Sequence, residues 1–276
     1  MRQSSVVRRP LLLLSCALLL GAAPSRPQRI VSLNLCADQY LLALADPGQI
    51  AGLTVLARDP TISAEAARAG SFAITKGAAE DVLALRPDLL IASPGRRRET
   101  MARLRDHHLA TLDLSPADSY EEVVAQIRSV ASAIGQRARG ETLIARMNAR
   151  LARLPRSAGR GRVAAYYQRR GFLTGTDTLI DDLMSRVGLV NLAARRPDAK
   201  LSRVTLEQMV VAKPDYLIVE TATDRIVDQG TELLHHPALA TIRRLRLPQA
   251  WTVCGGPAYV LAAESLSHQL TRVGTR

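Results

Sequence analysis

Hydrophobic and polar positions follow two alternating periods along most of the chain. Short apolar runs cover residues 29–33, 89–92 and 111–114, and a segment with apolar residues at helical spacing follows each of them. A second group of such runs covers residues 162–167, 216–219 and 250–253. Buried strands that alternate with helices are typical of α/β proteins. The pattern therefore predicts mostly parallel central sheets flanked by helices.

Residues 119–155 lack this alternation. Gly135 and Gly140 are the only glycines in the segment, which a loop at residues 155–161 follows. The apolar residues keep a helical spacing throughout: Val123, Val124, Ile127, Val130, Ala131, Ile134, Leu143, Ile144, Met147, Leu151 and Leu154. Such spacing predicts one long helix, kinked at a glycine.

A repeat lies on both sides of this predicted helix. Residues 80–91 recur without gaps as residues 207–218. In each copy an acidic residue stands in the first helical turn, where it suits the positive end of the helix dipole. A basic residue and a proline then end the helix before a buried strand begins. The repeat indicates two similar lobes, residues 26–118 and 156–276, joined by a single long helix at 119–155.

The first 25 residues have the pattern of a secretory signal peptide. Three arginines precede the apolar run at residues 11–20, and small residues follow it. The run has about half of the roughly 20 residues that a membrane-spanning helix needs. We expect cleavage before Arg26 and a periplasmic chain. Acylation at Cys16, in a loose lipid-attachment motif, is the alternative, although the apolar run continues past it.

The chain is strongly basic. Residues 1–25 contain three arginines and no acid, so their removal lowers the formal charge from +12 to +9. A basic surface suits nucleic acid, anionic lipid or an anionic solute, and an ordinary solvated surface is the simpler explanation. Export argues against a nucleic-acid partner.

Two cysteines follow the predicted leader, Cys36 and Cys254. An even number of cysteines in an oxidising compartment permits a disulfide. Two separate buried thiols are the alternative, because nothing local in the sequence brings the two residues together.

The spacings that enzymes and metal sites need are missing. His107–His108 and His235–His236 are adjacent pairs, whereas two ligands on one helix face stand four residues apart. The sequence has no Cys-x-x-Cys, Gly-x-Ser-x-Gly or phosphate-binding glycine loop. We predict no catalytic activity, no cofactor and no resident metal ion.

The order of several segments resembles the periplasmic binding proteins for iron-siderophore complexes and cobalamin. The segments are residues 29–34, both copies of the repeat, and residues 173–176, 179–183, 188–191 and 256–257 with the helix after them. The resemblance covers the whole chain after the leader. It implies a ligand cleft between two α/β lobes and an ABC importer permease dimer in the inner membrane as partner. We expect a monomer.

In this family a glutamate on each lobe docks onto arginines of the permease. Glu80 and Glu207 are equivalent acids of the repeat, so the resemblance implies that they form this docking pair. The alternative for each is an ordinary acid in a first helical turn.

The ligand is predicted from departures from the family. The cobalamin-binding member has a tryptophan before the glycine of its first pocket loop, where this chain has Lys76-Gly77. Loops after strands hold the ligands of open α/β sheets. We expect these residues to bind the ligand: Asn34, Cys36, Lys76, Arg97, Arg98, Tyr166, Tyr167, Arg169, Trp251, Cys254 and Tyr259.

Arginines and tyrosines suit the oxygen atoms of a ferric siderophore. The sequence therefore favours an iron-siderophore-type metal chelate over cobalamin or another corrinoid. A receptor for free zinc or manganese ions and a sensor without a transport role remain alternatives. If Cys36 and Cys254 both face the cleft, a disulfide would restrict its opening, whereas free thiols would contact the ligand.

Overall fold

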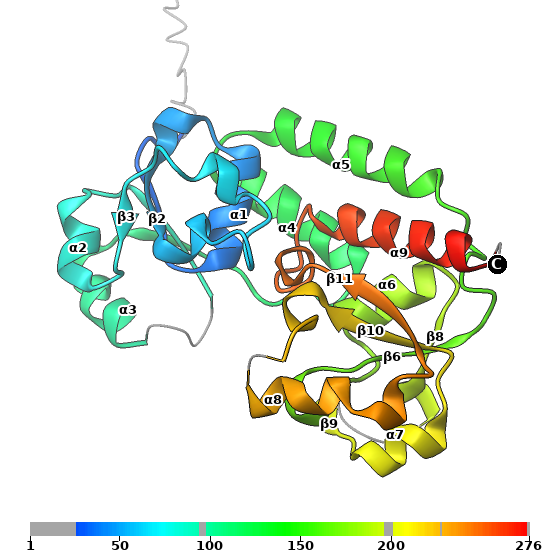
Figure 1. Cartoon of the computed structure of the whole chain (residues 1–276). Helices are drawn as coiled ribbons and strands as arrows, with labels where there is room; N and C mark the ends of the chain where they lie inside the picture. The colour runs from blue at the N-terminus through cyan, green and yellow to red at the C-terminus, as the bar shows by residue number, and fades with distance from the viewer. Residues whose placement is uncertain (1–25, 94–97, 196–200, 227, 275–276) are drawn as a thin grey trace, which may run out of the picture.

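The computed structural model describes residues 26–93, 98–195, 201–226 and 228–274, which form two α/β lobes (Figure 1). The predicted signal peptide and Arg97 lie outside the described residues. Within the described ranges no helix combines the length and the apolar character needed to cross a membrane.

The N-terminal lobe is built on a five-stranded parallel sheet with the order β3-β2-β1-β4-β5. Its strands are β1 (Ile30–Ser32), β2 (Ile50–Thr54), β3 (Ile74–Thr75), β4 (Leu89–Ala92) and β5 (Ala110–Asp113). Its helices are α1 (Leu35–Leu44), α2 (Ala79–Ala84) and α3 (Arg98–Leu104), with short 3-10 helices in the connections. Strands β1 and β4 are buried along their whole length, which explains their continuous apolar runs.

The C-terminal lobe has a four-stranded parallel sheet with the order β11-β10-β6-β8 and an antiparallel pair, β7-β9. Its strands are β6 (Val163–Tyr166), β7 (Phe172–Thr174), β8 (Val190–Asn191), β9 (Leu201–Arg203), β10 (Tyr216–Glu220) and β11 (Arg243–Leu247). Its helices are α6 (Leu179–Arg186), α7 (Leu206–Ala212), α8 (Gln229–Glu232) and α9 (Tyr259–Gly274). Both lobes confirm the predicted fold class.

The last strand does not lie at residues 250–253, and that prediction is wrong. Gln249–Trp251 form a 3-10 helix, and the strand at the sheet edge is the preceding segment, β11. Its leucines, Leu245 and Leu247, are buried and alternate with arginines on the outer face. An edge strand with one solvated face shows this alternation, but three arginines in five residues conceal it in the sequence.

The segment predicted as one long helix is an antiparallel pair, α4 (Tyr120–Ala133) and α5 (Arg137–Ala152). Gly135 makes the turn between them with a φ of +72°, and a Cβ there would approach the Arg26 side chain to 2.8 Å. The far ends of the pair meet where Tyr120 Oη donates a hydrogen bond to Asn148 Oδ1 at 2.7 Å. Both helices bury a face in the same core, so the helical spacing continues through the turn and hides it.

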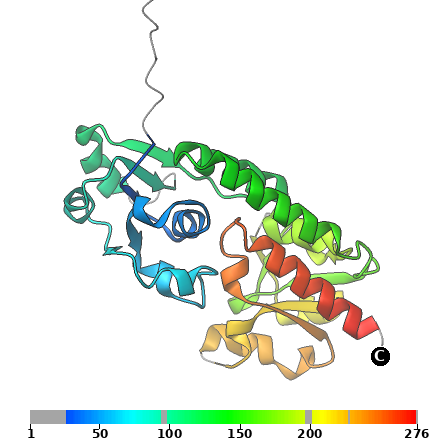
Figure 2. The same ribbon diagram turned by 90° about the horizontal axis from the view of Figure 1, so that it is seen from above.

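Helix α5 runs from one lobe to the other, as Figure 2 shows. At its start, Arg139 donates to the carbonyl of Leu44 at 2.8 Å and pairs with Asp46 at 2.5 Å. At its end, Arg150 pairs with Glu264 of α9 at 2.6 Å. Helix α5 thus crosses between the lobes, but it covers only the second half of the segment predicted as one helix, and α4 lies beside it.

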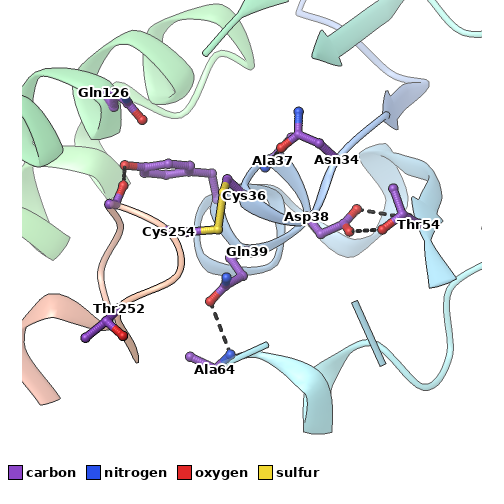
Figure 3. The surroundings of a disulfide bond; sticks show 12 residues. Asn34, Cys36, Ala37, Asp38, Gln39, Thr54, Ala64, Gln126, Thr252 and Cys254 are labelled. Atoms are coloured by element: carbon purple, nitrogen blue, oxygen red, sulfur yellow. Dashed lines mark hydrogen bonds between the residues drawn. A yellow bond between two sulfur atoms is a disulfide. The ribbon is translucent and has the colours of Figure 1, made fainter. Parts of the chain in front are cut away.

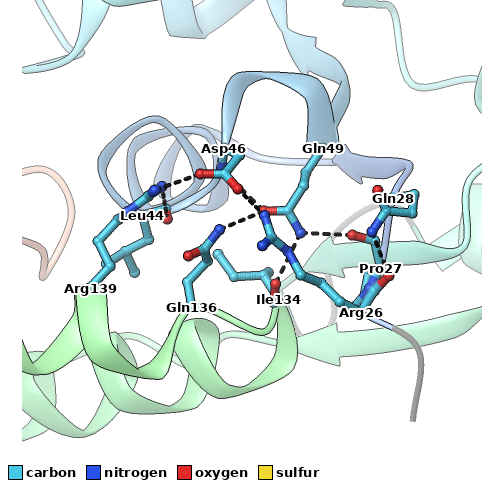
Figure 4. Close-up of polar contacts among 9 residues, drawn as sticks. All are labelled: Arg26, Pro27, Gln28, Leu44, Asp46, Gln49, Ile134, Gln136 and Arg139. Atoms are coloured by element: carbon cyan, nitrogen blue, oxygen red, sulfur yellow. Dashed lines mark hydrogen bonds and ion pairs between the residues drawn. The ribbon is translucent and has the colours of Figure 1, made fainter. Parts of the chain in front are cut away.

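A polar cluster fastens the N-terminal lobe to the turn of this hairpin (Figure 4). Asp46 accepts hydrogen bonds from Arg26 and Arg139, and these bonds lower the pKa of its carboxyl to about 2. Gln49 Nε2 donates to the carbonyl of Ile134 at 3.0 Å. The first described residue, the lobe and the hairpin are thus held at one point.

The repeat forms the same unit in each lobe. In the first copy α2 leads into β4, and in the second α7 leads into β10. Arg86 and Lys213 end the two helices in the left-handed region, with φ of 46° and 42°, directly before a proline. A left-handed residue turns the chain out of the helix, and the proline prevents the helix from continuing.

An aspartate after each proline fixes the next strand in its sheet. Asp88 accepts hydrogen bonds from the main-chain N–H groups of Gln28 at 2.6 Å and Arg29 at 3.0 Å. Asp215 accepts one from Val163 at 2.8 Å. The shared Pro-Asp step therefore joins β4 to β1 and β10 to β6 by the same contact.

Candidate ligand-binding site

A cavity of about 540 Å³ lies between the lobes and has walls from both of them. Residues at or after the carboxyl ends of β4, β5, β6 and β10 line it. Ligands of open α/β sheets bind at this end of the strands, and the volume lies in the range of small-molecule sites. This cavity is the candidate ligand site.

The cavity is polar, with hydroxyl, amide and carboxyl groups. Within the described residues its lining contains no lysine, arginine or histidine. The polar side chains are Ser93, Ser115, Asp118, Gln126, Tyr166, Gln168, Thr174, Thr178, Glu220, Gln249 and Thr252. The described wall thus offers hydrogen-bond donors and acceptors together with acidic groups.

The buried Tyr166 and the partly buried Glu220 form the centre of this wall. They end β6 and β10, which are neighbours in the sheet. Tyr166 Oη donates to Glu220 Oε1 at 3.3 Å. Burial raises the pKa of the Glu220 carboxyl, against the lowering effects of Tyr166 and Arg169, and burial also raises the pKa of Tyr166. Glu220 is therefore an acidic group that is partly withdrawn from solvent at the cavity wall.

Cys36 and Cys254 form a disulfide at the cavity, with their Cα atoms 5.4 Å apart (Figure 3). Cys36 lies in the first turn of α1, and Cys254 lies in the loop after the Gln249–Trp251 helix. The sequence left this pairing open, and the structure joins the two sulfur atoms across the lobes. Asn34 caps α1 by accepting from the N–H of Ala37 at 2.9 Å, and it does not line the cavity.

Tyr167 and Tyr259 were predicted to contact the ligand, but their side chains are buried elsewhere. Successive strand residues face opposite sides of a sheet, so Tyr167 points away from Tyr166 and donates to the carbonyl of Val204 at 3.0 Å. Tyr259 begins α9 and accepts a hydrogen bond from Arg186 Nε at 2.8 Å. Both residues are structural in this arrangement.

Two of the four predicted cations, Lys76 and Arg169, are also away from the cavity wall. Lys76 follows β3 and is exposed, and Arg169 is exposed and pairs with Asp228. Neither lines the cavity, and Trp251 packs against the main core instead. Arg97 and the side chain of Arg98 lie outside the described residues. Of the predicted ligand residues, the structure brings Cys36, Tyr166 and Cys254 to the site.

Several lining residues escaped the sequence analysis. Glu220 directly follows the apolar run of β10, just as Ser93 follows β4 and Ser115 lies just beyond β5. The strand-end rule that selected basic side chains applies equally to these residues. The same rule, applied to acidic as well as basic side chains, would have selected Glu220.

Glu80 and Glu207 stand in the first turns of α2 and α7, one on each lobe. The Glu80 side chain is 73% exposed and lies 3.4 Å from Arg103. Glu207 is exposed, and a hydrogen bond with Thr205 lowers the pKa of its carboxyl. Both acids are thus accessible on the surface. Among the described residues no group of three or more His, Cys, Asp or Glu side chains is placed to hold a metal ion.

Comparison with known proteins agrees with this architecture. A periplasmic heme-binding protein from Roseiflexus sp. RS-1 superposes with a TM-score of 0.71 at 24% identity, covering 89% of this chain and 98% of the other. The periplasmic vitamin B12 binding protein of Vibrio cholerae superposes with a TM-score of 0.65 at 17% identity, covering 91% and 99%. At these identities the likeness shows the fold.

Sequence comparison gives a relative and a family. A cobalamin-binding protein of Halobacterium salinarum is 26% identical over 209 residues, which are 73% of this chain and 56% of the relative. This chain therefore spans about half the length of that relative. The model of the periplasmic binding protein family matches residues 30–245, most of the chain. The chain belongs to the periplasmic binding proteins of the iron-chelate and cobalamin class.

Proposed function

We propose that this protein is the solute-binding component of an ABC-type importer and that its interlobe cavity takes a corrinoid of the cobalamin type. The observation that carries the ligand assignment is the partly buried Glu220 carboxyl at the cavity wall, beside Tyr166. A corrin ring carries neutral amide side chains, whose N–H groups need acceptors. Carboxylate, hydroxyl and amide oxygens supply them.

An anionic ligand fits this wall less well. Heme carries two propionates and catecholate siderophores are strongly anionic, so each would place negative charge near the Glu220 carboxyl, at a wall whose described lining contains no lysine, arginine or histidine. The sequence favoured an anionic chelate because of cations that the described cavity does not contain. The cavity supports the reverse order, with the corrinoid first, and the similarity to a cobalamin-binding relative agrees with it.

A binding experiment tests the ligand class. The protein is titrated with cyanocobalamin, hemin, a ferric hydroxamate and a ferric catecholate, and Trp251 fluorescence or calorimetry reports binding. We expect cyanocobalamin to bind most tightly. Tight binding of hemin or a ferric chelate, with no binding of cyanocobalamin, would overturn the assignment.

Substitutions locate the binding residues. Glu220→Gln removes a charged acceptor worth about 1.5–3 kcal/mol, so we expect the Kd for cyanocobalamin to rise by about 10- to 150-fold. Tyr167→Phe is the matched control, because that hydroxyl contacts Val204 and lies off the cavity. Burial of Glu220 disfavours its ionised form, so Glu220→Gln is also expected to raise the Tm at neutral pH. Lost affinity with gained stability distinguishes a binding role from a structural one.

Docking to the permease is proposed for Glu80 and Glu207. Both are exposed first-turn acids at equivalent positions of the two lobes, and paired lobes match a two-fold permease. Replacing both by glutamine should abolish uptake while leaving ligand affinity unchanged. Glu141→Gln, an exposed acid paired with Arg128 on the connecting hairpin, is the control. Unimpaired uptake by the double variant would contradict the docking role and favour a sensor.

A further inference from the structure

The floor of the cavity is formed where two distant segments meet. The start of α1 comes from the N-terminal lobe, and the loop at residues 254–256 comes from the C-terminal lobe. Besides the disulfide, Tyr40 Oη donates to the carbonyl of Gly255 at 2.5 Å. A Cβ at Gly255 would lie 2.5 Å from the Cβ of Ala117. The loop is therefore pressed tightly against the other lobe, and a side chain at position 255 has no room.

The N-terminal side of the disulfide is rigidly supported. Two residues after Cys36, the fully buried Asp38 accepts hydrogen bonds from the N–H of Thr54 at 3.0 Å and from its hydroxyl at 2.5 Å (Figure 3). These bonds fix the first turns of α1 to the end of β2. A displacement of Cys254 is consequently resisted by the sheet of the N-terminal lobe.

Within the described residues the lobes are connected along the chain by the crossing at residues 114–119 and by the hairpin of α4 and α5. The disulfide adds a covalent connection that is independent of both. It also lies at the ligand site, since both of its cysteines line the cavity. The lobes also share one buried core cluster, which includes Leu41 of α1, Leu183 of α6 and Leu266 of α9. The disulfide adds a covalent constraint to this packing at the cavity itself.

We propose that the Cys36–Cys254 bond is a positioning element of the ligand cavity: it holds the two lobes at the separation at which both walls contact the ligand. This inference rests on the proposed function of the cavity. A cleft preformed in this way does not have to close around its ligand. The free energy of ordering the lobes therefore does not weaken binding.

Reduction of the bond has a defined outcome. A dithiol supplies two electrons and is itself oxidised to a disulfide, and Cys36 and Cys254 each end as a thiol. The lobes then populate arrangements in which one wall has left the ligand. If such arrangements outnumber the competent one by about ten to one, the apparent Kd rises by about tenfold.

The experiment compares the oxidised protein, the dithiol-reduced protein and the variant Cys36→Ser/Cys254→Ser, at a temperature where circular dichroism shows all three folded. Hydrogen exchange at residues 254–256 measures how often the loop opens, and X-ray scattering measures the radius of gyration. Titration with cyanocobalamin measures the affinity of the cavity. Thr205→Ala is the control, because it lowers stability in the C-terminal lobe away from the cavity. We expect faster exchange, a larger radius and about tenfold weaker binding without the bond, with reoxidation restoring the first state.

The outcomes separate the two proposals. If exchange, radius and affinity stay the same after reduction, the bond serves stability alone and the inference is wrong. An equal loss of affinity in Thr205→Ala would also overturn it. If the oxidised protein fails to bind cyanocobalamin, the ligand assignment fails, whereas exchange and scattering still decide whether the bond positions the lobes.

Discussion

The two lobes share the way their repeated helix ends but not the way it begins. Helix α7 begins at Thr205, whose side chain accepts from the N–H of Gln208 at 3.3 Å while Gln208 bonds back to the N–H of Thr205 at 3.0 Å. Helix α2 begins after Ala78, which has no side-chain cap. The shared end carries the Pro-Asp contact that places a central strand. The two copies thus keep the contact that places a central strand and differ in the cap that begins the helix.

The lobes also differ in what they give to the cavity. The N-terminal sheet supplies small hydroxyl side chains, Ser93 and Ser115, after its strands. The C-terminal sheet supplies Tyr166 and Glu220, with partly buried ionisable groups. The lobes are thus similar as scaffolds and unequal as ligand contacts.

The largest effect is expected when the bond between the lobes is removed. The disulfide closes a loop of 218 residues, and losing such a link typically costs about 2–5 kcal/mol. Cys36→Ser/Cys254→Ser should lower the free energy of unfolding by that amount, and calorimetry should show the lobes melting in separate steps. Cys36→Ser alone removes the same bond and should give the same loss. A single unchanged transition would contradict the prediction.

The Pro-Asp contacts are expected to differ in strength between the lobes. Asp88 accepts two main-chain hydrogen bonds and Asp215 accepts one. Asp88→Ala should therefore cost about 1–2 kcal/mol, with a smaller loss for Asp215→Ala, in urea unfolding. Asp81→Ala, an exposed neighbour in α2, serves as control. Equal losses at Asp88 and Asp215 would show that the second hydrogen bond adds nothing.

Substitutions at the two helix caps are expected to change the free energy of unfolding in opposite directions. Thr205→Ala removes the cap of α7 and should lower the free energy of unfolding by about 1 kcal/mol. Ala78→Ser gives α2 the side-chain cap that it lacks, because residue 78 already has the extended backbone of an N-cap. It should raise the free energy of unfolding by less than about 1 kcal/mol. Thermal melting of both variants and of the combined variant checks this. A destabilising Ala78→Ser would mean that the start of α2 is fixed by other contacts.

The smallest expected effect is the pH dependence of the stability that Asp46 contributes where the N-terminal lobe is fastened to the hairpin. Arg26 and Arg139 lower the pKa of Asp46 from 3.8 to about 2, so its contribution is present above about pH 4 and is lost as the pH falls through about 2. Asp46→Asn should melt slightly below the unmodified protein at pH 7, and the difference should close near pH 2. A difference that stays constant across this range would exclude the ion pair as its cause.

Much of the fold was predictable because buried parallel strands leave continuous apolar runs. Strands β1, β4, β6 and β10 were found in this way, and the repeat gave the lobes. The turn at Gly135 was not found, because both helices of the hairpin keep their apolar faces toward one core. Strand β11 was missed because arginines occupy the solvated face of an edge strand.

The site was less predictable than the fold. The strand-end rule located the right edge of the sheets, but not which side chains turn inward. Tyr166 and Tyr167 are adjacent, and the alternation of a strand sends only one of them to the cavity. Choosing residues for positive charge led to Lys76 and Arg169 and passed over Glu220. The cysteine pairing also needed the three-dimensional structure, because it joins the two lobes.

The disulfide also sets an order of events in the making of the protein. A chain that emerges N-terminus first exposes Cys36 long before Cys254, which follows 218 residues later. No other cysteine stands between them, and the third in the chain, Cys16, lies in the predicted leader. After the predicted leader, Cys36 therefore has no partner cysteine in the chain until Cys254 has emerged. A product truncated before residue 254 cannot form the bond between the lobes.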